Sequence, residues 1–350
     1  MLTVEHMLAA AREKGASDIL LTAGVPPMVR VNGSLEKLDY PELTPEELDR
    51  IVFSVMNEQQ LKIYREKGET GFALSVLRNE RYRVNVFRQQ GCAACSIRIV
   101  HEKLPTAEQL CIPEAVTDLA YKKRGLVIMA GTSGSGKTTT LAAVTDKINK
   151  ERNAHIITIE DPIEYVHCHE KAVVNQREIG TDAMSCAGAL RAAVREDADV
   201  IVVGEIKDLD TVSAAVTAAE TGHLVLSTFG AAGAQSVIER IIAAYPTDSR
   251  QNMRLRLSMV LEAVISQQLI PREDKAGCVA AFEIMYASDP IKQLIKEGNT
   301  SRILSVMREC EKEGMITMDD ALTDLCLKGV ISAKSAVEYA WDSCYVRAHL

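Results

Sequence analysis

Short apolar runs alternate with helical patterns through the middle of the chain. Four runs of apolar, largely β-branched residues have the length of a strand; they cover 125–130, 155–160, 199–204 and 223–228. Continuous apolar runs are typical of strands that are buried on both faces, as in parallel sheets covered by helices. The pattern therefore predicts a mainly parallel sheet whose ligand binds at the carboxyl ends of the strands.

The segments on either side of these runs have different patterns. The first hundred residues predict a separate α/β unit in which short strands follow an amphipathic helix. Residues 44–47 combine an N-cap threonine, a proline and an acidic third position, which together begin a helix. A second helix is predicted over 58–67. The end of the chain is mostly helical, with a long helix expected over 248–268 and a strand pair near 267–270 and 279–285.

The chain has 350 residues, enough for more than one domain with a core of its own. We expect an N-terminal domain over 1–104 and a linker over 105–120, which contains two prolines. The core, with a helical C-terminal region, is expected over 121–350.

Composition narrows the class of protein. No apolar run reaches the roughly 18 residues that span a bilayer, and the N-terminus lacks a secretory signal, so we expect a cytoplasmic protein. The net charge of −8, the five Phe and the single Trp disfavour a nucleic-acid-binding surface. The nine cysteines indicate reduced thiols, and Cys92 and Cys95 form a CxxC pair without the second pair of a zinc site.

Residues 131–138, GTSGSGKT, follow the first apolar run and precede a helical pattern. They match GxxxxGK[ST], in which backbone N–H groups and a helix N-terminus cradle phosphates. Lys137 can reach the β- and γ-phosphates, and the Thr138 hydroxyl can bind Mg²⁺. The sequence therefore predicts a protein that binds a nucleoside triphosphate. The predicted binding residues are Thr132, Ser133, Gly134, Ser135, Gly136, Lys137, Thr138 and Thr139.

Acidic residues follow two further strands of the predicted sheet. Gly204 ends the third apolar run, where many P-loop NTPases have an Mg²⁺-binding Asp, and Glu205 follows it. Glu205 is placed to accept a proton from the attacking water. Glu160, Asp161 and Glu164 end the second run, and such clustered carboxylates are costly without a cation or hydrogen-bond donors. We expect Glu160 to help hold Mg²⁺, partly through water; an acidic cap without metal is the alternative.

Other polar side chains in these strands are weaker candidates. His223 begins the fourth run, and Ser227 and Thr228 end it, where a γ-phosphate sensor would lie. Arg81 and Arg83 share one face of a strand in the N-terminal unit, because alternate residues of a strand point the same way. Such arginines are either a solvated face or arginine fingers that reach a triphosphate.

Together the motifs resemble the type II/IV secretion ATPase superfamily, and most closely the PilT-like type IV pilus retraction ATPases. GTSGSGKTTT matches the phosphate-binding box, ITIEDPIEYV the Asp box, LRAAVREDADVIVVGEIKD the atypical Walker B box and ETGHLVLST the start of the His box. GASDILLTAGVPPMVRVNG and RYRVNVFRQ resemble the N-terminal domain of that family, and LIPREDKAGCVAAFEIM and DPIKQLIKEG its C-terminal stretches. The likeness covers nearly the whole chain.

The resemblance implies a RecA-like P-loop core and a smaller N-terminal PAS-like α/β domain. It implies a homo-hexamer that hydrolyses ATP with Mg²⁺ and powers type IV pilus retraction and twitching motility. The implied partners are pilin and an inner-membrane platform protein, at the inner face of the cytoplasmic membrane. The candidate catalytic residues are then Glu205, Glu160, Asp161, Glu164, Arg81, Arg83 and His223.

The chain departs from the family pattern at several positions. Gly230 replaces the second histidine of the His box, Lys207 an arginine after the Walker B box and Leu20 a histidine near the N-terminus, and DPIKQLIKE differs from AIRNLIRE. Phosphate binding is intact, so these changes concern coupling and turnover. Three alternatives stay open: a regulatory nucleotide-binding ring with little hydrolysis, a pilus assembly ATPase and a nucleic-acid motor.

Overall fold

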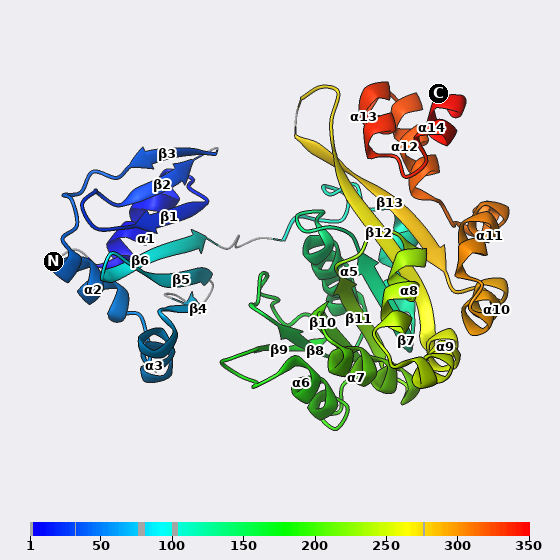
Figure 1. Ribbon diagram of the computed structural model, residues 1–350, viewed down its shortest axis with the longest axis horizontal. Helices are drawn as coiled ribbons and strands as arrows, with labels where there is room; N and C mark the ends of the chain where they lie inside the picture. The colour runs from blue at the N-terminus through cyan, green and yellow to red at the C-terminus, as the bar shows by residue number, and fades with distance from the viewer. Residues whose placement is uncertain (1–2, 32, 76–80, 100–103, 276) are drawn as a thin grey trace. The chain divides into compact units, whose positions relative to one another are not determined.

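The computed structural model describes residues 3–31, 33–75, 81–99, 104–275 and 277–350 (Figure 1). The chain divides into two compact units, residues 1–103 with 162–166 and residues 104–161 with 167–350. Each unit has its own hydrophobic core. In the part of the chain described here, every helix is too short or too polar to cross a membrane.

The first unit is built on a six-stranded antiparallel sheet. In spatial order its strands are β3 (Ser34–Lys37), β2 (Met28–Val31), β1 (Asp18–Leu21), β6 (Cys92–Ile99), β5 (Arg81–Gln89) and β4 (Glu69–Ser75). Its helices are α1 (Val4–Glu13), α2 (Pro45–Phe53) and α3 (Glu58–Lys67). Buried residues of α1 and α2 share one apolar cluster with Ile19, Val84 and Val86 of the strands. This unit confirms the α/β organisation predicted for the first hundred residues.

Local sequence explains where these helices begin and end. The Thr44 side chain accepts a hydrogen bond from the backbone of Glu47, and the Glu47 side chain accepts one from the backbone of Thr44. This capping box satisfies N–H groups that have no partner inside α2, as the sequence predicts. Gly68 adopts a left-handed conformation and ends α3, which glycine does without a Cβ clash.

The second unit is built on a seven-stranded sheet. In spatial order its strands are β13 (Cys278–Tyr286), β12 (Leu261–Pro271), β7 (Gly125–Ala130), β11 (Leu224–Phe229), β10 (Val200–Ile206), β8 (His155–Glu160) and β9 (Val173–Glu178). Only the pairing of β13 with β12 is antiparallel among these strands. The mainly parallel sheet is therefore confirmed. Residues 131–136 follow β7, while Glu160 ends β8 and Glu205 lies near the end of β10, next to its final residue Ile206.

Helices cover both faces of this sheet, because alternate residues of each strand enter different apolar clusters. Val127 and Met129 of β7 pack with Leu141 of α5 (Lys137–Glu151), whereas Leu126 and Ile128 pack on the opposite face. The helices of that opposite face are α6 (Cys186–Ala193), α7 (Leu209–Glu220), α8 (Ala234–Ala243), α9 (Thr247–Val260), α10 (Asp289–Glu297) and α11 (Ile303–Glu309).

Residues 104–121 also belong to the second unit. They include α4 (Glu114–Thr117) and the 3-10 helix η1 (Asp118–Tyr121), and Ile112, Val116 and Leu119 are buried in the cluster that contains α5. Residues 105–120, which were expected as a linker, therefore contribute side chains to the core of the second unit.

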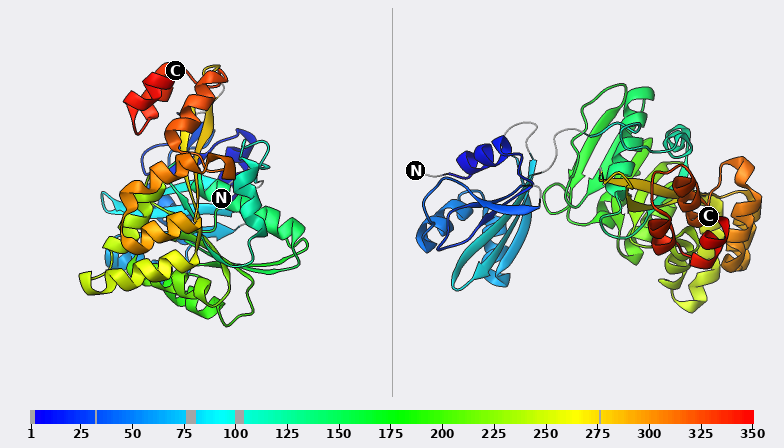
Figure 2. Two further views of the ribbon diagram at one scale, coloured as in Figure 1. Left: turned by 90° about the vertical axis from the view of Figure 1, so that its right-hand side faces the viewer. Right: turned by 90° about the horizontal axis from the view of Figure 1, so that it is seen from above.

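The C-terminal helices pack at one end of the β12–β13 hairpin (Figures 1 and 2). They are α12 (Met318–Leu327), α13 (Ala333–Tyr339) and α14 (Ser343–His349), and the short 3-10 helices η2 (Thr300–Arg302) and η3 (Glu311–Glu313) precede them. Met318, Leu322 and Val346 form a small apolar cluster with Ile270 and Val279 of the hairpin. The predominance of helices near the end of the chain agrees with the sequence pattern.

Two elements differ from the sequence prediction. The long helix expected over 248–268 is wrong in its second half, because α9 ends at Val260 and β12 begins at Leu261. Residues 261–265 are largely buried between β7 and β13, and this tertiary pairing overrides a helical pattern. The edge strand β9 was not predicted, because its polar residues Asn175, Gln176 and Arg177 interrupt any apolar run.

Glu283 is a buried carboxylate in the middle of β13. It has no exposed surface, and its Oε1 and Oε2 accept hydrogen bonds from the backbone N–H groups of Ala234 (2.7 Å) and Met318 (3.4 Å). Burial raises the pKa of Glu283 from 4.5 to about 7; the two N–H groups oppose this rise, and nearby Asp319 adds to it. The folded state therefore binds this proton more tightly than the unfolded state.

We expect this proton to make stability depend on pH. Its contribution is fully present below about pH 4.5 and is lost as pH rises through about 7, an effect of up to about 3 kcal/mol. Urea unfolding between pH 5 and pH 7.5 should therefore show a steeper fall for the wild type than for Glu283→Gln, which stays neutral. Equal slopes for the two proteins would contradict the raised pKa.

Candidate nucleotide-binding site

The glycine-rich segment forms a tight loop between the end of β7 and the start of α5. Gly134 and Gly136 have φ values of +78° and +88°, a region that side chains disfavour. A Cβ on Gly131 would lie 2.5 Å from the carbonyl oxygen of Gln267 and 2.5 Å from Ser135 Oγ. The loop therefore needs glycine at these positions, and its backbone leads directly into the N-terminus of α5.

Polar groups in this loop fit a phosphate. Lys137 is 9% exposed, and its Nζ donates a hydrogen bond to the carbonyl of Thr132 (2.7 Å). Ser135 Oγ is buried and has no hydrogen-bond partner among the described residues. A buried hydroxyl without a partner is costly, and a phosphate oxygen would satisfy it. The N-terminus of α5 adds partial positive charge at the same place.

Gln267 of β12 packs against the loop, a role that the sequence analysis did not predict. Its Oε1 accepts a hydrogen bond from Thr140 Oγ1 (2.7 Å), and its amide nitrogen would lie 2.8 Å from a Cβ on Gly136. Gln267 is one of several polar residues in β12, so the sequence gives no signal that singles it out for this role. Gln267 holds both the loop and the first turn of α5 against the sheet.

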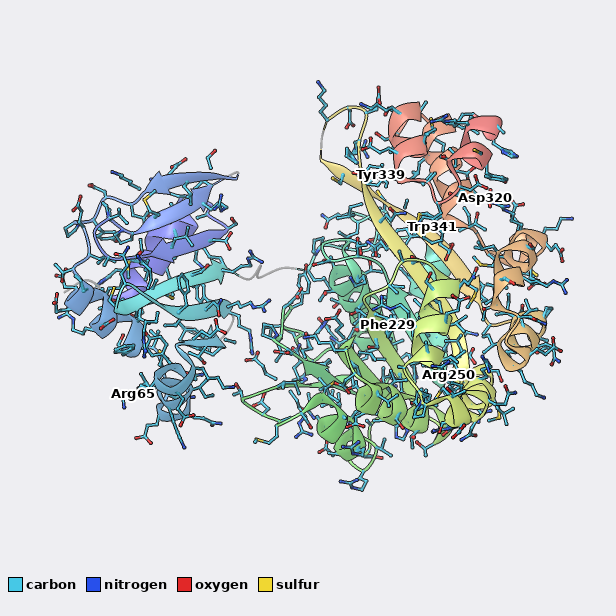
Figure 3. The ribbon with its side chains drawn as sticks, in the orientation of Figure 1. Arg65, Phe229, Arg250, Asp320, Tyr339 and Trp341 are labelled. Carbon is cyan, nitrogen blue, oxygen red and sulfur yellow. The ribbon has the colours of Figure 1, made fainter. Side chains whose placement is uncertain are left out.

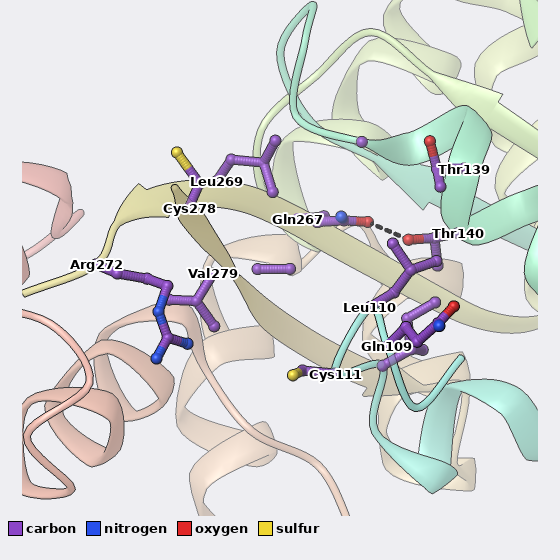
Figure 4. A pocket seen from close by; sticks show the side chains of 13 residues that line it. Gln109, Leu110, Cys111, Thr139, Thr140, Gln267, Leu269, Arg272, Cys278 and Val279 are labelled. Atoms are coloured by element: carbon purple, nitrogen blue, oxygen red, sulfur yellow. Dashed lines mark hydrogen bonds between the residues drawn. The ribbon is translucent and has the colours of Figure 1, made fainter. Parts of the chain in front are cut away.

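A cavity of about 400 Å³ opens beside the start of α5 (Figure 4). Thr139 and Thr140 line one side of it, the β12–β13 hairpin lines another through Leu269 and Val279, and Leu110 completes the wall. Most of these side chains are apolar or small. Such a cavity next to an anion-binding loop accommodates a flat, largely apolar group.

The strand-end acids lie at the same edge of the sheet as the loop. β8, β10, β11 and β7 are parallel, so their carboxyl ends coincide. A Cβ on Gly204 would lie 3.4 Å from Cα of Glu160, so Glu160 at the end of β8 adjoins Gly204, the residue before Glu205 on β10. Strands are spaced by about 4.8 Å, which puts β10 about 10 Å from β7. The structure therefore brings Glu205 and Glu160 to the edge that carries Lys137.

Each of these carboxylates has a donor nearby. Glu160 accepts hydrogen bonds from Thr158 Oγ1 (2.6 Å) and Gln176 Nε2 (3.1 Å). Lys207 Nζ lies 3.3 Å from Asp161 Oδ2 and 3.9 Å from Glu205 Oε2. The carboxylates therefore have hydrogen-bond donors and one positive charge beside them. That charge, Lys207, lies between Asp161 at the end of β8 and Glu205 on β10. Glu164 is exposed in the segment after β8.

Gly230 follows β11 and lies beside Glu205. A Cβ at Gly230 would lie 3.5 Å from Glu205 Oε1, an ordinary van der Waals distance. Arg240 of α8 donates a hydrogen bond to the Gly230 carbonyl (2.6 Å), and its guanidinium lies over the Phe229 ring. The position that departs from the His box therefore faces the candidate base.

Three polar residues of the fourth apolar run make hydrogen bonds within the second unit. His223 precedes β11, at the amino end of the strand, and its Nδ1 lies 3.0 Å from the carbonyl oxygen of Ala218. Because the loop lies at the carboxyl ends, His223 lies at the opposite edge of the sheet within one chain, and its catalytic role stays a prediction. Ser227 and Thr228 are buried and donate hydrogen bonds to the carbonyls of Val203 and Gly204, so they tie β11 to β10.

Arg81 and Arg83 belong to β5 of the first unit. Tyr82, Val84 and Val86 of this strand are buried, and Arg83 is exposed and pairs across the sheet with Arg98. The alternation is as predicted, and the role of these arginines at a nucleotide stays a prediction.

Cys92 and Cys95 are both buried, and burial raises the pKa of Cys95 to about 12, which makes its thiol unreactive. Within the described ranges, no group of three or more His, Cys, Asp or Glu side chains is arranged to hold a metal by itself.

A phosphate-binding loop that leads from a parallel strand into a helix, with carboxylates at the neighbouring strand ends, defines a P-loop NTPase. The model of the family described as type II/IV secretion system protein matches residues 2–323. The chain belongs to this family. It has the RecA-like fold and is a PilT-like ATPase.

Two curated relatives and one solved structure show how close the similarity is. The type IV pilus retraction ATPase PilT of Pseudomonas aeruginosa is 41% identical over 339 residues, which cover 97% of this chain and 98% of that protein. The type IV pilus ATPase PilU of the same organism is 40% identical over 336 residues, covering 96% and 88%. A crystal structure of the pilus retraction motor PilT with bound ADP matches with a TM-score of 0.93 at 41% identity, covering 99% of this chain and 100% of that one.

Proposed function

We propose that this chain is the motor of type IV pilus retraction, a homo-hexamer that uses ATP hydrolysis to withdraw pilin from the pilus and so drives twitching motility. The observation that supports this most is the intact phosphate loop with Glu205 at the same sheet edge, in a chain 41% identical to a retraction ATPase over 97% of its length. We place the motor at the inner face of the cytoplasmic membrane, with an inner-membrane platform protein as partner.

The residues of the second unit divide the chemistry between them. Lys137 exchanges the Thr132 carbonyl for phosphate oxygens, and Ser135 Oγ donates to the same group. Glu205 accepts the proton of the attacking water, while Lys207 keeps Glu205 and Asp161 in place. Thr138, and Glu160 through water, would hold Mg²⁺, which would supply positive charge to the β- and γ-phosphates.

We assign the 400 Å³ cavity to the nucleoside part of ATP. It is lined by Thr139 and Thr140 next to the phosphate loop and by side chains of the β12–β13 hairpin. The hairpin contributes apolar and small side chains such as Leu269 and Val279, together with the polar Gln267 and Arg272. A purine base buries a flat apolar face, so this lining suits it. Arg81 or Arg83 of a subunit in the ring would then supply positive charge to the γ-phosphate.

Deletion of the gene in its own host tests this function directly. We expect deletion of the gene from its own host to abolish pilus retraction and leave the cells hyperpiliated, and the wild-type chain to restore retraction. Retraction that persists at its normal rate in the deletion strain would contradict a motor role. Loss of surface pili instead would indicate the assembly ATPase.

A second candidate, a regulatory ring with little hydrolysis, is favoured by Gly230, which lacks a ring that could hydrogen-bond phosphate beside Glu205. Gly230→His discriminates between the two. A Cβ at this position meets Glu205 Oε1 at 3.5 Å and no backbone atom within 4 Å, so the substitution can be accommodated at its first carbon. We expect kcat to rise about three- to tenfold with KM for ATP nearly unchanged. Steady-state phosphate release measures both constants. A wild type without measurable hydrolysis would favour the regulatory ring.

A further inference from the structure

The segment from Gly230 to Gly233 connects the end of β11 to the start of α8, and its first residue lies beside the candidate base Glu205. Its sequence, Gly-Ala-Ala-Gly, has no long side chain with which to anchor itself. Glycine has the largest conformational freedom of any residue, so a single conformation of this loop depends on contacts from elsewhere. Arg240 supplies such a contact at the Gly230 end.

The Gly233 end is held by residues that lie far away in the sequence. The Gly233 N–H donates a hydrogen bond to Ser266 Oγ (3.0 Å) on β12, and the Ala234 N–H donates to Glu283 Oε1 (2.7 Å) on β13. Gly233 has a φ of +88°, and a Cβ there would lie 3.0 and 3.1 Å from Cη2 and Cζ3 of Trp341. The indole of Trp341 therefore packs directly on the backbone of Gly233.

Trp341 is itself fixed by the first turn of α12. It lies between α13 and α14, where the C-terminal helices meet the core (Figure 3). Its backbone N–H donates a hydrogen bond to Oδ1 of Asp319 (2.8 Å), whose side chain is buried. The adjacent Met318 N–H donates to Glu283 Oε2, so one turn of α12 holds both contacts that reach the loop.

These contacts form a continuous path between two distant parts of the second unit. It runs from Glu205 to Gly230, along the loop to Gly233, and through Trp341 and Glu283 to α12. The path contacts the side chain expected to take the proton, and it does not include the phosphate-binding loop. A change in the C-terminal helices would therefore alter turnover without altering ATP binding.

We propose that Trp341 is a positioning residue for ATP hydrolysis: its packing on Gly233 holds the loop so that Gly230 stays against Glu205, and the C-terminal helices thereby set the turnover rate. This inference rests on the proposed function of Glu205. Glu283 and Asp319 fix the geometry of the contact.

Steady-state kinetics of the full-length chain test the positioning role. For Trp341→Ala we expect kcat to fall about tenfold, with KM for ATP within about twofold of wild type, because side chains along such a path alter coupling by this order. Trp341→Phe keeps an aromatic ring on Gly233 and should retain kcat within about twofold. Leu327→Ala, which truncates an exposed apolar side chain of α12, is the matched control and should leave both constants unchanged. An unchanged kcat in Trp341→Ala, or an equal loss in Leu327→Ala, would overturn the proposal.

Fluorescence provides a second test, because Trp341 is the single tryptophan of the chain. Gly233→Ala, whose added Cβ would lie 3.0 Å from Cη2 of the indole, should shift this emission and lower kcat together, with KM for ATP nearly unchanged. A shifted emission with an unchanged kcat would overturn the proposal. A Glu205→Gln protein with normal turnover would remove the proposed role of Glu205, whereas an inactive Glu205→Gln with a normal Trp341→Ala would remove only this inference.

Discussion

Replacing Glu205 with glutamine is expected to lower ATP turnover about 10²- to 10⁴-fold, the range attributed to a positioned general base. Glutamine keeps the shape of the side chain and cannot take a proton from water. Glu205 lies at the carboxyl end of β10, at the edge of the sheet that carries the phosphate-binding loop. It is not part of that loop. ATP affinity should therefore change by less than about threefold. Phosphate release gives kcat, and equilibrium binding of a fluorescent ATP analogue gives the affinity.

Glu309→Gln is the matched control for this experiment. Glu309 is an exposed acid on α11, so the same chemical change there should leave turnover unchanged. Turnover in Glu205→Gln within a few-fold of the wild type would remove Glu205 as the base. Glu160 would be the next candidate, because it adjoins Gly204 on the neighbouring strand.

The parts of the site that depend on local sequence could be predicted from it. The loop between β7 and α5 is a contiguous motif, and the apolar runs of β7, β8, β10 and β11 have lengths and compositions that fit buried parallel strands. In a parallel sheet, the end of a strand determines the edge of the sheet. The position of Glu205 and Glu160 with the loop therefore follows from their places after the strands.

The same rule places His223 at the opposite edge, since it precedes its strand. His223 was a candidate because it lies in the His box of the family. Within one chain, its hydrogen bonds are to the nearby Thr221 and Ala218.

The contacts missed by sequence reasoning join residues that are far apart in the chain. Gln267 lies under Gly131 and Gly136, and Trp341 lies against Gly233. No local pattern marks these pairs, because a polar residue in a strand or an aromatic residue between two helices has many possible environments. The failure to predict where α9 ends has the same cause. The end of α9 is determined by the pairing of β12 with β7 and β13, and not by the intrinsic preference of residues 261–268.

Gly131→Ala is expected to disrupt the phosphate-binding loop. An added methyl group would lie 2.5 Å from the carbonyl oxygen of Gln267, and β12 cannot retreat because it is paired on one side with β7 and on the other with β13. The loop must therefore move away from the sheet, at a cost on the order of 3 kcal/mol. We expect ATP affinity to fall about 100-fold, since a shift of the loop misaligns its N–H groups. Tm should fall by about 5–10 °C.

Gly134→Ala separates this clash from backbone strain alone. Gly134 has a φ of +78°, but a Cβ there meets no atom within 4 Å. Alanine in this conformation costs about 1 kcal/mol, so Tm should fall by only about 2–4 °C and ATP affinity by less than about fivefold. Calorimetry and binding of the ATP analogue measure both variants. If the two substitutions had equal effects, strain in the glycine backbone would explain the loss, and the close approach of β12 to the loop would have no part in ATP binding.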